Sequence, residues 1–464
     1  MDVIDKLKHN IGTIGKHLFI DDSEEKFGDA TYPYWNMTLM SLGYFMNKNV
    51  MLLGEPGFGK TTAAKVMGSV YSGYPFDLFE SAQFQGCPEQ TVESLVGRLD
   101  FSKLTQEEKV IWQMGIYLPM IILDEMNRLP GGKQDIELNS VDTGRFSYLN
   151  DTFFSGKKPF FATANHPDDG NHVIIPPLAD RFAISIELGY QGPFAKEQIR
   201  RAKGNIKSDL TNNEITNKII ACLKDTQTDV GTKLKQIDSL RKPYVKDLVT
   251  KTGIELITEE EAEHFREKIK SIEFSSEAYI FLQCIDTELN YGGTYGKKRS
   301  CDAIDSNGHM ENIASSHVKN AFSPRALEAS LEDFSRAIAV YTGSKEVEKE
   351  HIRAMAPYVM EHRLVFTDDY TAAHEEKNRL EMNEIFFKAP TTPGFLARKL
   401  VEGIDENYKK VKDQVNLVYS ALREDKDLTA KQKQEAKDLL KTDIQKIDHP
   451  LLKCLIYECK RRGM

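Results

Sequence analysis

The sequence lacks any long apolar run, since none approaches the ~20 residues that a membrane-spanning helix needs. Its first residues, Met1-Asp2-Val3-Ile4-Asp5-Lys6, do not show the charged-then-apolar pattern of a secretory signal. The six cysteines are scattered and form no CxxC pair. These absences predict a reduced, cytoplasmic protein that has no membrane partner.

An excess of positive charge is also missing. Lys and Arg number 61 against 70 Asp and Glu, which gives a net charge of −9. Proteins dedicated to duplex binding usually carry a basic excess that neutralises phosphates. A nucleic-acid partner is therefore not expected, and a local basic patch that binds nucleic acid is the alternative.

The length and the pattern of apolar runs predict several domains. A chain of 464 residues exceeds one compact core. Strand-like runs at 50–53, 120–123 and 159–163 alternate with helical patterns, which favours a buried parallel sheet between helices. We predict a polar N-terminal segment, an αβα domain, a helical insertion or linker, an all-helical domain and a helical C-terminal extension, with the bounds 1–34, 35–190, 191–257, 258–365 and 366–464.

Two helix signals stand out in the C-terminal half. Thr258 with Glu261, and Thr429 with Gln432, have the spacing of capping boxes. Apolar residues at steps of three and four mark one stripe over 400–422. We expect this stripe to pack within a helical hairpin, and an intermolecular coiled coil is the alternative.

A phosphate-binding loop follows the first strand. The run 54–61 fits G-x-x-x-x-G-K-[ST] and precedes a helical pattern, which is the context that this motif requires. Glycines let the backbone N–H groups surround phosphate, and the helix N-terminus adds a favourable dipole. Lys60 would contact the β- and γ-phosphates, and Thr61 would ligate magnesium. The predicted nucleotide-binding residues are Gly54, Glu55, Pro56, Gly57, Phe58, Gly59, Lys60, Thr61 and Thr62.

Polar residues end the two later strands. Asp124 and Glu125 follow the strand at 120–123, and Asn165 follows the strand at 159–163. Ligands of such sheets bind at the carboxyl ends of the strands. Asp124 would hold magnesium, Glu125 would orient and deprotonate the attacking water, and Asn165 would help to hold that water.

The order of the motifs resembles the MoxR family of AAA+ ATPases, in the helix-2-insert clade. Five segments carry the resemblance: Leu123–Arg128, Ala162–Pro167, Pro177–Phe182, Ser323–Ala326 and Ala354–Leu364. It implies an AAA+ P-loop αβα sandwich with a parallel sheet, an all-helical lid over 258–365 and a helical C-terminal extension. The regions 200–255 and 291–320 look longer than the family norm, and the tail after 366 has no counterpart.

The same resemblance implies roles that spacing alone does not. Arg181 would be an arginine finger that reaches the neighbouring subunit's nucleotide, and Arg325 would be sensor 2. The cofactors would be ATP and Mg²⁺, and the protein would form rings, expected to be hexamers. A chaperone-like remodeller is the leading function, with a partner that carries a von Willebrand factor A domain. The alternatives are a nucleic-acid motor and an ATP-binding regulatory scaffold.

Residues 145–154 are predicted to form the hairpin of the helix-2 insert. Two β-prone runs flank the turn-prone pair Asn150-Asp151. Phe146, Tyr148 and Phe154 are expected to share one face of the hairpin, and Phe153 is expected to face the other way. One aromatic face is expected to be exposed to a pore or a partner, and a hairpin buried in the domain is the alternative.

Two further clusters are not expected to be sites. Cys284, Cys301, His309 and His317 match no common zinc spacing. The basic run 297–299 near two tyrosines is expected to be a solvated loop rather than a nucleic-acid contact.

Overall fold

The computed structural model describes residues 2–89, 91, 95–99, 110–166, 172–189, 192–193, 195–290, 314–381, 392–422, 429–443, 446–447 and 449–461. The chain forms two compact units, 1–268 and 269–464. The boundary between them falls within helix α11 (Glu259–Ser271). The five-part division stays a prediction.

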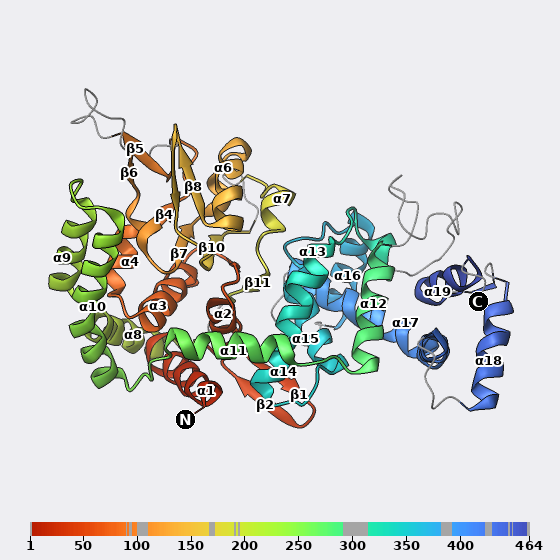
Figure 1. Cartoon of the computed structure of the whole chain (residues 1–464). Helices are drawn as coiled ribbons and strands as arrows, with labels where there is room; N and C mark the ends of the chain where they lie inside the picture. Colours follow the sequence, from red (N-terminus) through yellow and green to blue (C-terminus); the bar gives the residue numbers. More distant parts are fainter. Residues whose placement is uncertain are drawn as a thin grey trace. The chain divides into compact units, whose positions relative to one another are not determined.

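A five-stranded parallel sheet forms the centre of the first unit (Figure 1). Its order is β11-β3-β10-β7-β4, with parallel pairing throughout. β10 therefore lies between β3 and β7, which brings the carboxyl ends of these three strands together. The strands are β3 (Val50–Leu53), β4 (Phe84–Gln85), β7 (Ile121–Asp124), β10 (Phe160–Ala164) and β11 (Ile184–Glu187).

Helices cover this sheet, as the apolar strands predict. All five residues of β10 are buried, which requires cover on both of its faces. Helix α3 (Lys60–Ser72) packs against β7 and β10, and α4 (Phe76–Ala82) packs against α3. The predicted αβα fold is confirmed.

The N-terminal segment is more ordered than its polar composition indicates. It forms α1 (Val3–Thr13), a π-helix (Ile14–Leu18) and a hairpin of β1 (Glu24–Phe27) and β2 (Ala30–Pro33), and it is followed by α2 (Trp35–Phe45). Ile4, Leu7 and Ile11 form the buried face of α1. Asp21 accepts a 3.0 Å hydrogen bond from the backbone N–H of Met37 in the first turn of α2.

The region 191–257 is helical, as predicted. It comprises α8 (Ala195–Asn205), a π-helix (Ile206–Leu210), α9 (Asn213–Lys224) and α10 (Val230–Thr252). The buried hydroxyl of Tyr244 in α10 lies 2.9 Å from Ser69 Oγ in α3 and donates a 2.9 Å hydrogen bond to the Leu210 carbonyl. These bonds fix α10 to the helix that follows the phosphate loop.

The first unit also contains further helices and strands. They are the paired strands β5 (Gly97–Leu99) and β6 (Val110–Trp112), the 3₁₀ turns Met114–Tyr117 and Met126–Arg128, α6 (Gly131–Thr143) and α7 (Pro176–Ala179).

None of the described helices of the chain is both long and apolar enough to cross a membrane.

The predicted hairpin exists, but its register differs from the expected one. β8 (Arg145–Tyr148) pairs with β9 (Asp151–Phe154), and Tyr148 lies opposite Asp151. The turn residues are therefore Leu149 and Asn150, with Leu149 at φ +52°. In this antiparallel pairing Phe153 lies directly opposite Phe146, and directly opposed residues project from the same face of a hairpin.

Phe146 and Phe153 consequently share a face and are both buried. The prediction that they face opposite ways is wrong. On the other face Phe154 is 68% exposed, and Leu149 at the tip is 60% exposed. The hairpin thus combines a buried aromatic face with two exposed apolar residues, Phe154 at its base and Leu149 at its tip.

Lys158 supplies a pH-dependent contribution to stability. Its Nζ donates 2.7 Å hydrogen bonds to the carbonyls of Ile116 and Leu118, and burial lowers its pKa to about 8 from an ordinary 10.5. The folded state therefore binds fewer protons than the unfolded state between these values, so stability rises with pH in this window. Relative to Lys158→Met, we expect the wild type to gain up to about 1 kcal/mol from about pH 7.5 to about pH 9, measured by thermal melting. Equal pH profiles of the two proteins would contradict this.

The second unit is helical. Its elements are α12 (Ser276–Asn290), a 3₁₀ turn (Ala314–His317), α13 (Pro324–Ala326), a π-helix (Leu327–Glu332), α14 (Asp333–Thr342), α15 (Lys349–Met360), α16 (Asp368–Glu381), α17 (Pro393–Leu422), α18 (Ala430–Lys441) and α19 (Pro450–Arg461). The C-terminal helices belong to the same compact unit as α12–α15.

The predicted apolar stripe lies on α17 and packs within this unit. Ile404, Tyr408 and Val415 are buried, and α17 packs against α12, α15, α18 and α19. The interpretation as internal packing is confirmed over an intermolecular coiled coil. Both capping boxes, at Thr258 and Thr429, are also present.

Candidate nucleotide-binding site

The loop 54–61 joins β3 to α3 in a conformation that depends on glycine. Gly54 has φ +141°, and a Cβ there would lie 2.5 Å from the Leu188 carbonyl oxygen. Gly59, at φ +83°, is the N-cap of α3. The backbone therefore wraps closely in front of a helix N-terminus, which is the arrangement that binds phosphate groups.

Lys60 lies at the centre of this loop. Its Nζ donates hydrogen bonds to the carbonyls of Gly54 (2.7 Å) and Glu55 (2.9 Å) and to Asn165 Oδ1 (2.8 Å). Burial lowers the pKa of Lys60, while the nearby carboxylates of Asp124, Glu55 and Glu125 act in the opposite direction. The ammonium is thus held among oxygen acceptors, which phosphate oxygens could replace.

The two predicted magnesium ligands lie in direct contact. Thr61 donates a 2.5 Å hydrogen bond to Asp124 Oδ1. Hydroxyl and carboxylate oxygens are the hard ligands that Mg²⁺ prefers, so this pair fits the ion.

Thr163 completes the contact, and the sequence analysis did not identify it. Its hydroxyl donates a 2.7 Å hydrogen bond to Asp124 Oδ1 and accepts one of 2.9 Å from the Glu125 N–H. The one signal in the sequence is a polar residue within the otherwise apolar strand β10, where Thr163 is fully buried.

Thr163→Val is therefore expected to impair the site without creating a cavity. The substitution removes the donor to Asp124 and leaves the Glu125 N–H without its acceptor. Loss of such a supporting residue costs about 10–100-fold in metal affinity or activity. Magnesium titrations of nucleotide hydrolysis measure the effect, and Thr163→Ser, which keeps the hydroxyl, is the matched control. Unchanged magnesium dependence in Thr163→Val would refute this role.

Glu125 has a strained backbone and two side-chain partners. Its φ of +52° is uncommon for a residue other than glycine, and strain of this kind collects at functional sites. Oε2 accepts a 3.0 Å hydrogen bond from Gln85 Nε2, and Oε1 lies 3.1 Å from Arg128 Nη2. Gln85, at the end of β4, was not identified from the sequence because its strand is distant along the chain.

Asn165 is oriented by a second asparagine. Asn127 Nδ2 donates to the Asn165 carbonyl at 2.9 Å, and the Asn165 N–H donates to Asn127 Oδ1 at 3.3 Å. This pair fixes the backbone of Asn165, whose side chain contacts Lys60. The structure thus brings the phosphate loop, the acidic pair and Asn165 to one edge of the sheet.

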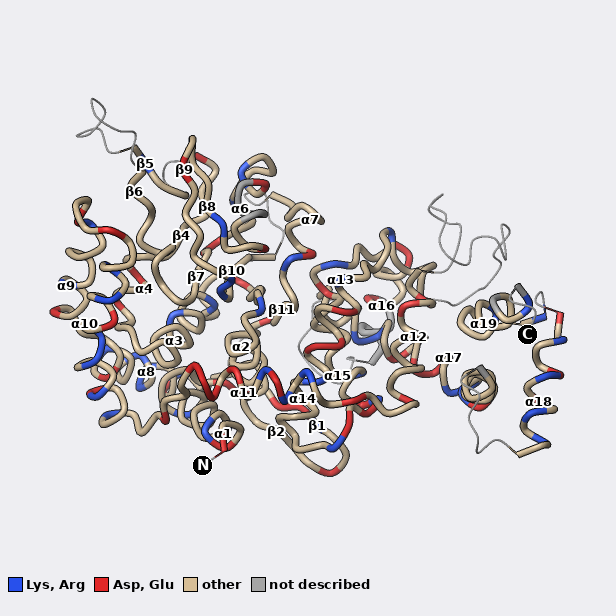
Figure 2. The backbone as a smooth tube through the Cα atoms, viewed as in Figure 1, with Lys and Arg blue, Asp and Glu red and all other residues tan. Residues whose placement is uncertain are grey.

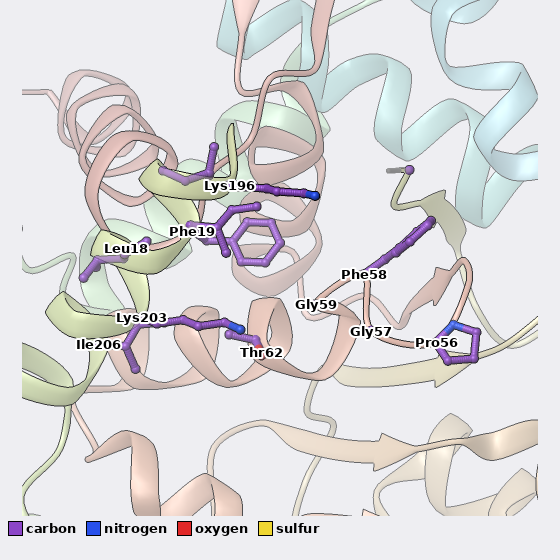
Figure 3. A pocket seen from close by; sticks show the side chains of 14 residues that line it. Leu18, Phe19, Pro56, Gly57, Phe58, Gly59, Thr62, Lys196, Lys203 and Ile206 are labelled. Carbon is purple, nitrogen blue, oxygen red and sulfur yellow. The ribbon is translucent and has the colours of Figure 1, made fainter. Parts of the chain in front are cut away.

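A cavity of about 340 Å³ adjoins the phosphate loop (Figure 3). Figure 3 shows loop residues on one side and side chains from the N-terminal segment and α8 on the other. The apolar part fits a flat aromatic base, and two lysines supply positive charge. The lining comprises Leu18, Phe19, Ile20, Pro56, Gly57, Phe58, Gly59, Thr62, Gly189, Lys196, Ile199, Ala202, Lys203 and Ile206.

The two predicted arginines lie on other elements than these residues. Among the described residues, Arg181 donates a 2.7 Å hydrogen bond to the Pro177 carbonyl, and its Nε lies 3.9 Å from Asp142 Oδ2. Arg325 lies in α13 of the second unit. The roles of both arginines stay predictions.

One expectation about cysteine is wrong. Cys87, Cys222, Cys284 and Cys459 are free, but Cys454 is disulfide-bonded, so the cysteines are not all reduced. Cys301, His309 and the basic run 297–299 lie outside the described residues.

Comparisons with known proteins agree with this geometry. Residues 49–182 match the family described as AAA domain (dynein-related subfamily), and residues 310–385 match the AAA lid domain. A crystal structure described as that of a "putative ATPase" from Cytophaga hutchinsonii has a TM-score of 0.53 and 16% sequence identity. The match covers 83% of this chain and 95% of that one. No curated protein matches at the sequence level.

Proposed function

We propose that an AAA domain and its helical lid make this protein a magnesium-dependent ATPase of the AAA+ class. One observation carries the proposal: Lys60, Thr61, Asp124, Glu125 and Asn165 converge at the carboxyl edge of one parallel sheet. These are the cation, metal ligands, base and polar positioning group that phosphoryl transfer to water needs. The matched AAA domain contains all five.

Each residue has a separate task in this proposal. Lys60 exchanges its carbonyl and Asn165 contacts for phosphate oxygens. Thr61 and Asp124 hold magnesium, which neutralises developing negative charge when bound. Glu125 must leave Gln85 and Arg128 to accept a proton from the attacking water, and Asn165 helps to position that water. Release of Glu125 is then a step at which hydrolysis can be controlled.

The adjoining cavity would hold the base and choose the nucleotide. Phe19 and Ile199 supply apolar surface for a purine. We infer ATP rather than GTP from the resemblance to AAA+ proteins.

The partner and the assembly form the finer part of the proposal. We infer a cytoplasmic, MoxR-like chaperone that forms rings, expected to be hexamers, and acts on a protein partner with a von Willebrand factor A domain. The acidic net charge disfavours a nucleic-acid motor. Figure 2 shows acidic residues interspersed with basic ones on α8–α11, rather than a continuous basic stripe. The exposed face of the β8–β9 hairpin offers Phe154, opposite Arg145, for a partner contact.

A trapping experiment tests this function. Glu125→Gln protein is loaded with ATP and magnesium, purified, and analysed for the material that it retains, with Lys60→Ala as the control that cannot load. A retained protein supports the remodeller. Retained nucleic acid together with DNA- or RNA-stimulated hydrolysis would favour the motor, and ATP binding by the wild type without turnover would favour the scaffold.

A further inference from the structure

A buried group of three metal-ligating side chains lies in the second unit. Cys284 and Glu288 are four residues apart on α12, so they share one helix face. His449 lies directly before α19, which packs against α12 (Figure 1). Cys284 Sγ is 3.7 Å from His449 Nε2, and Nε2 is 3.6 Å from Glu288 Oε1. The three ligand atoms all lie within 4.8 Å of one another, and all three residues are buried.

The buried carboxylate of Glu288 lacks strong hydrogen bonds from the described residues around it. It is fully buried, and its Oε1 has no hydrogen-bond partner among the described residues. From the described part of the chain, its Oε2 accepts two long hydrogen bonds, from the Ala314 N–H (3.3 Å) and Asn407 Nδ2 (3.4 Å). Burial of a carboxylate without strong partners is costly, and such groups are usually paired or bound to a metal.

Two of the three ligand separations match those of a tetrahedral zinc ion, and the third lies within 4.8 Å. Zinc bonds of about 2.3 Å to sulfur and about 2.0–2.1 Å to nitrogen and oxygen place S and N about 3.6 Å apart, and N and O about 3.4 Å apart. The observed separations are 3.7 and 3.6 Å. We propose that Cys284, Glu288 and His449 bind one zinc ion, with water as the fourth ligand.

Zinc suits this donor set better than the other common metals. Thiolate and imidazole ligands favour zinc over magnesium or calcium, which prefer oxygen alone. Binding replaces the proton of the Cys284 thiol by a sulfur–zinc bond, and that proton passes to the buffer. The site would join α12 to the start of α19 and so fasten the C-terminal helix to the core of this unit.

A catalytic cysteine is the competing interpretation of the same residues. Cysteine nucleophiles are thiolates that lie in partly exposed, electropositive surroundings. Cys284 is buried, and burial raises the pKa of its thiol well above the ordinary value. Without a metal this thiol would be inert.

The test is metal binding by the full chain, purified without a histidine tag. After chelation and dialysis, zinc is titrated and bound metal is measured by mass spectrometry. We expect about one zinc per chain, and at least a tenfold loss of affinity in Cys284→Ser, Glu288→Gln and His449→Gln. Cys459→Ser, at another buried cysteine of the same unit, is the matched control and should bind zinc as the wild type does. No zinc uptake by the wild type, or equal uptake by Cys284→Ser, overturns the proposal.

Cobalt substitution keeps the test informative if a variant fails to fold. A thiolate–cobalt bond gives near-ultraviolet absorption that wild-type and Cys459→Ser protein should show when cobalt is added. Absence of that band in correctly folded wild type would also overturn the site. ATP hydrolysis is measured in parallel, and because the zinc ligands all lie outside the AAA domain, its outcome does not decide the zinc result.

Discussion

Glu125→Gln is expected to bind ATP normally but to hydrolyse it about 10²–10⁴-fold more slowly, since a general base contributes a factor of this size. The amide keeps the size of the side chain but cannot accept the proton of the attacking water. Lys60→Ala is expected to lose ATP binding, because it removes the one cation that the phosphate loop presents within hydrogen-bond reach of Gly54 and Asn165. Equilibrium binding and phosphate release measured on the same samples separate the two effects.

Glu80→Gln is the control for loss of a carboxylate. Glu80 lies in α4, has a largely exposed side chain, and pairs with Lys65 rather than with any residue of the site. It should hydrolyse ATP at the wild-type rate. Turnover by Glu125→Gln at that rate would show that another group is the base.

Arg181→Ala is expected to bind ATP and assemble, yet to hydrolyse about 10³–10⁵-fold more slowly, which is the contribution of an arginine finger in P-loop enzymes. In the isolated chain the guanidinium contacts Pro177 and Asp142. We therefore expect it to reach a nucleotide only across an interface between subunits. Steady-state hydrolysis together with native mass spectrometry tests rate and assembly at once.

Mixing two inactive variants distinguishes a finger from a structural arginine. When Arg181→Ala and Lys60→Ala subunits share a ring, some interfaces contain an intact Lys60 beside an intact Arg181. Recovered activity supports action in trans. No recovery in proven mixed rings would refute it. Arg200→Ala removes an exposed arginine that pairs with Glu197 on its own helix, and it should behave as wild type.

The sequence determined the parts of this protein that depend on short-range pattern. The phosphate loop, the acids after β7 and the strands themselves were predictable, because a buried parallel strand is apolar along its length and ligands collect where it ends. Both capping boxes and the stripe on α17 were predictable for a similar reason, since helical periodicity is local. Short apolar runs and glycine spacing were sufficient for these predictions.

Tertiary structure decided which distant segments come into contact and which face of the hairpin is buried. Gln85 and Thr163 reach the acidic pair only because β4 and β10 flank β7 in the sheet. The cavity beside the loop joins 18–20 to 196–206, and neither segment has a nucleotide motif. In the hairpin, Phe153 lies opposite Phe146 and shares its buried face, whereas Phe154 lies opposite Arg145 on the exposed face, because packing against the rest of the unit decides which face is covered.

The proposed zinc site is the clearest example of a site that the sequence alone does not predict. In the sequence, Cys284 is followed within 33 positions by one cysteine and two histidines, at a spacing that matches no common zinc motif. In the fold its neighbours are Glu288, one helical turn away, and His449, 165 positions along the chain. Only the packing of α19 against α12 places these three together, because burial of apolar helix faces, rather than any local pattern, sets which distant side chains meet.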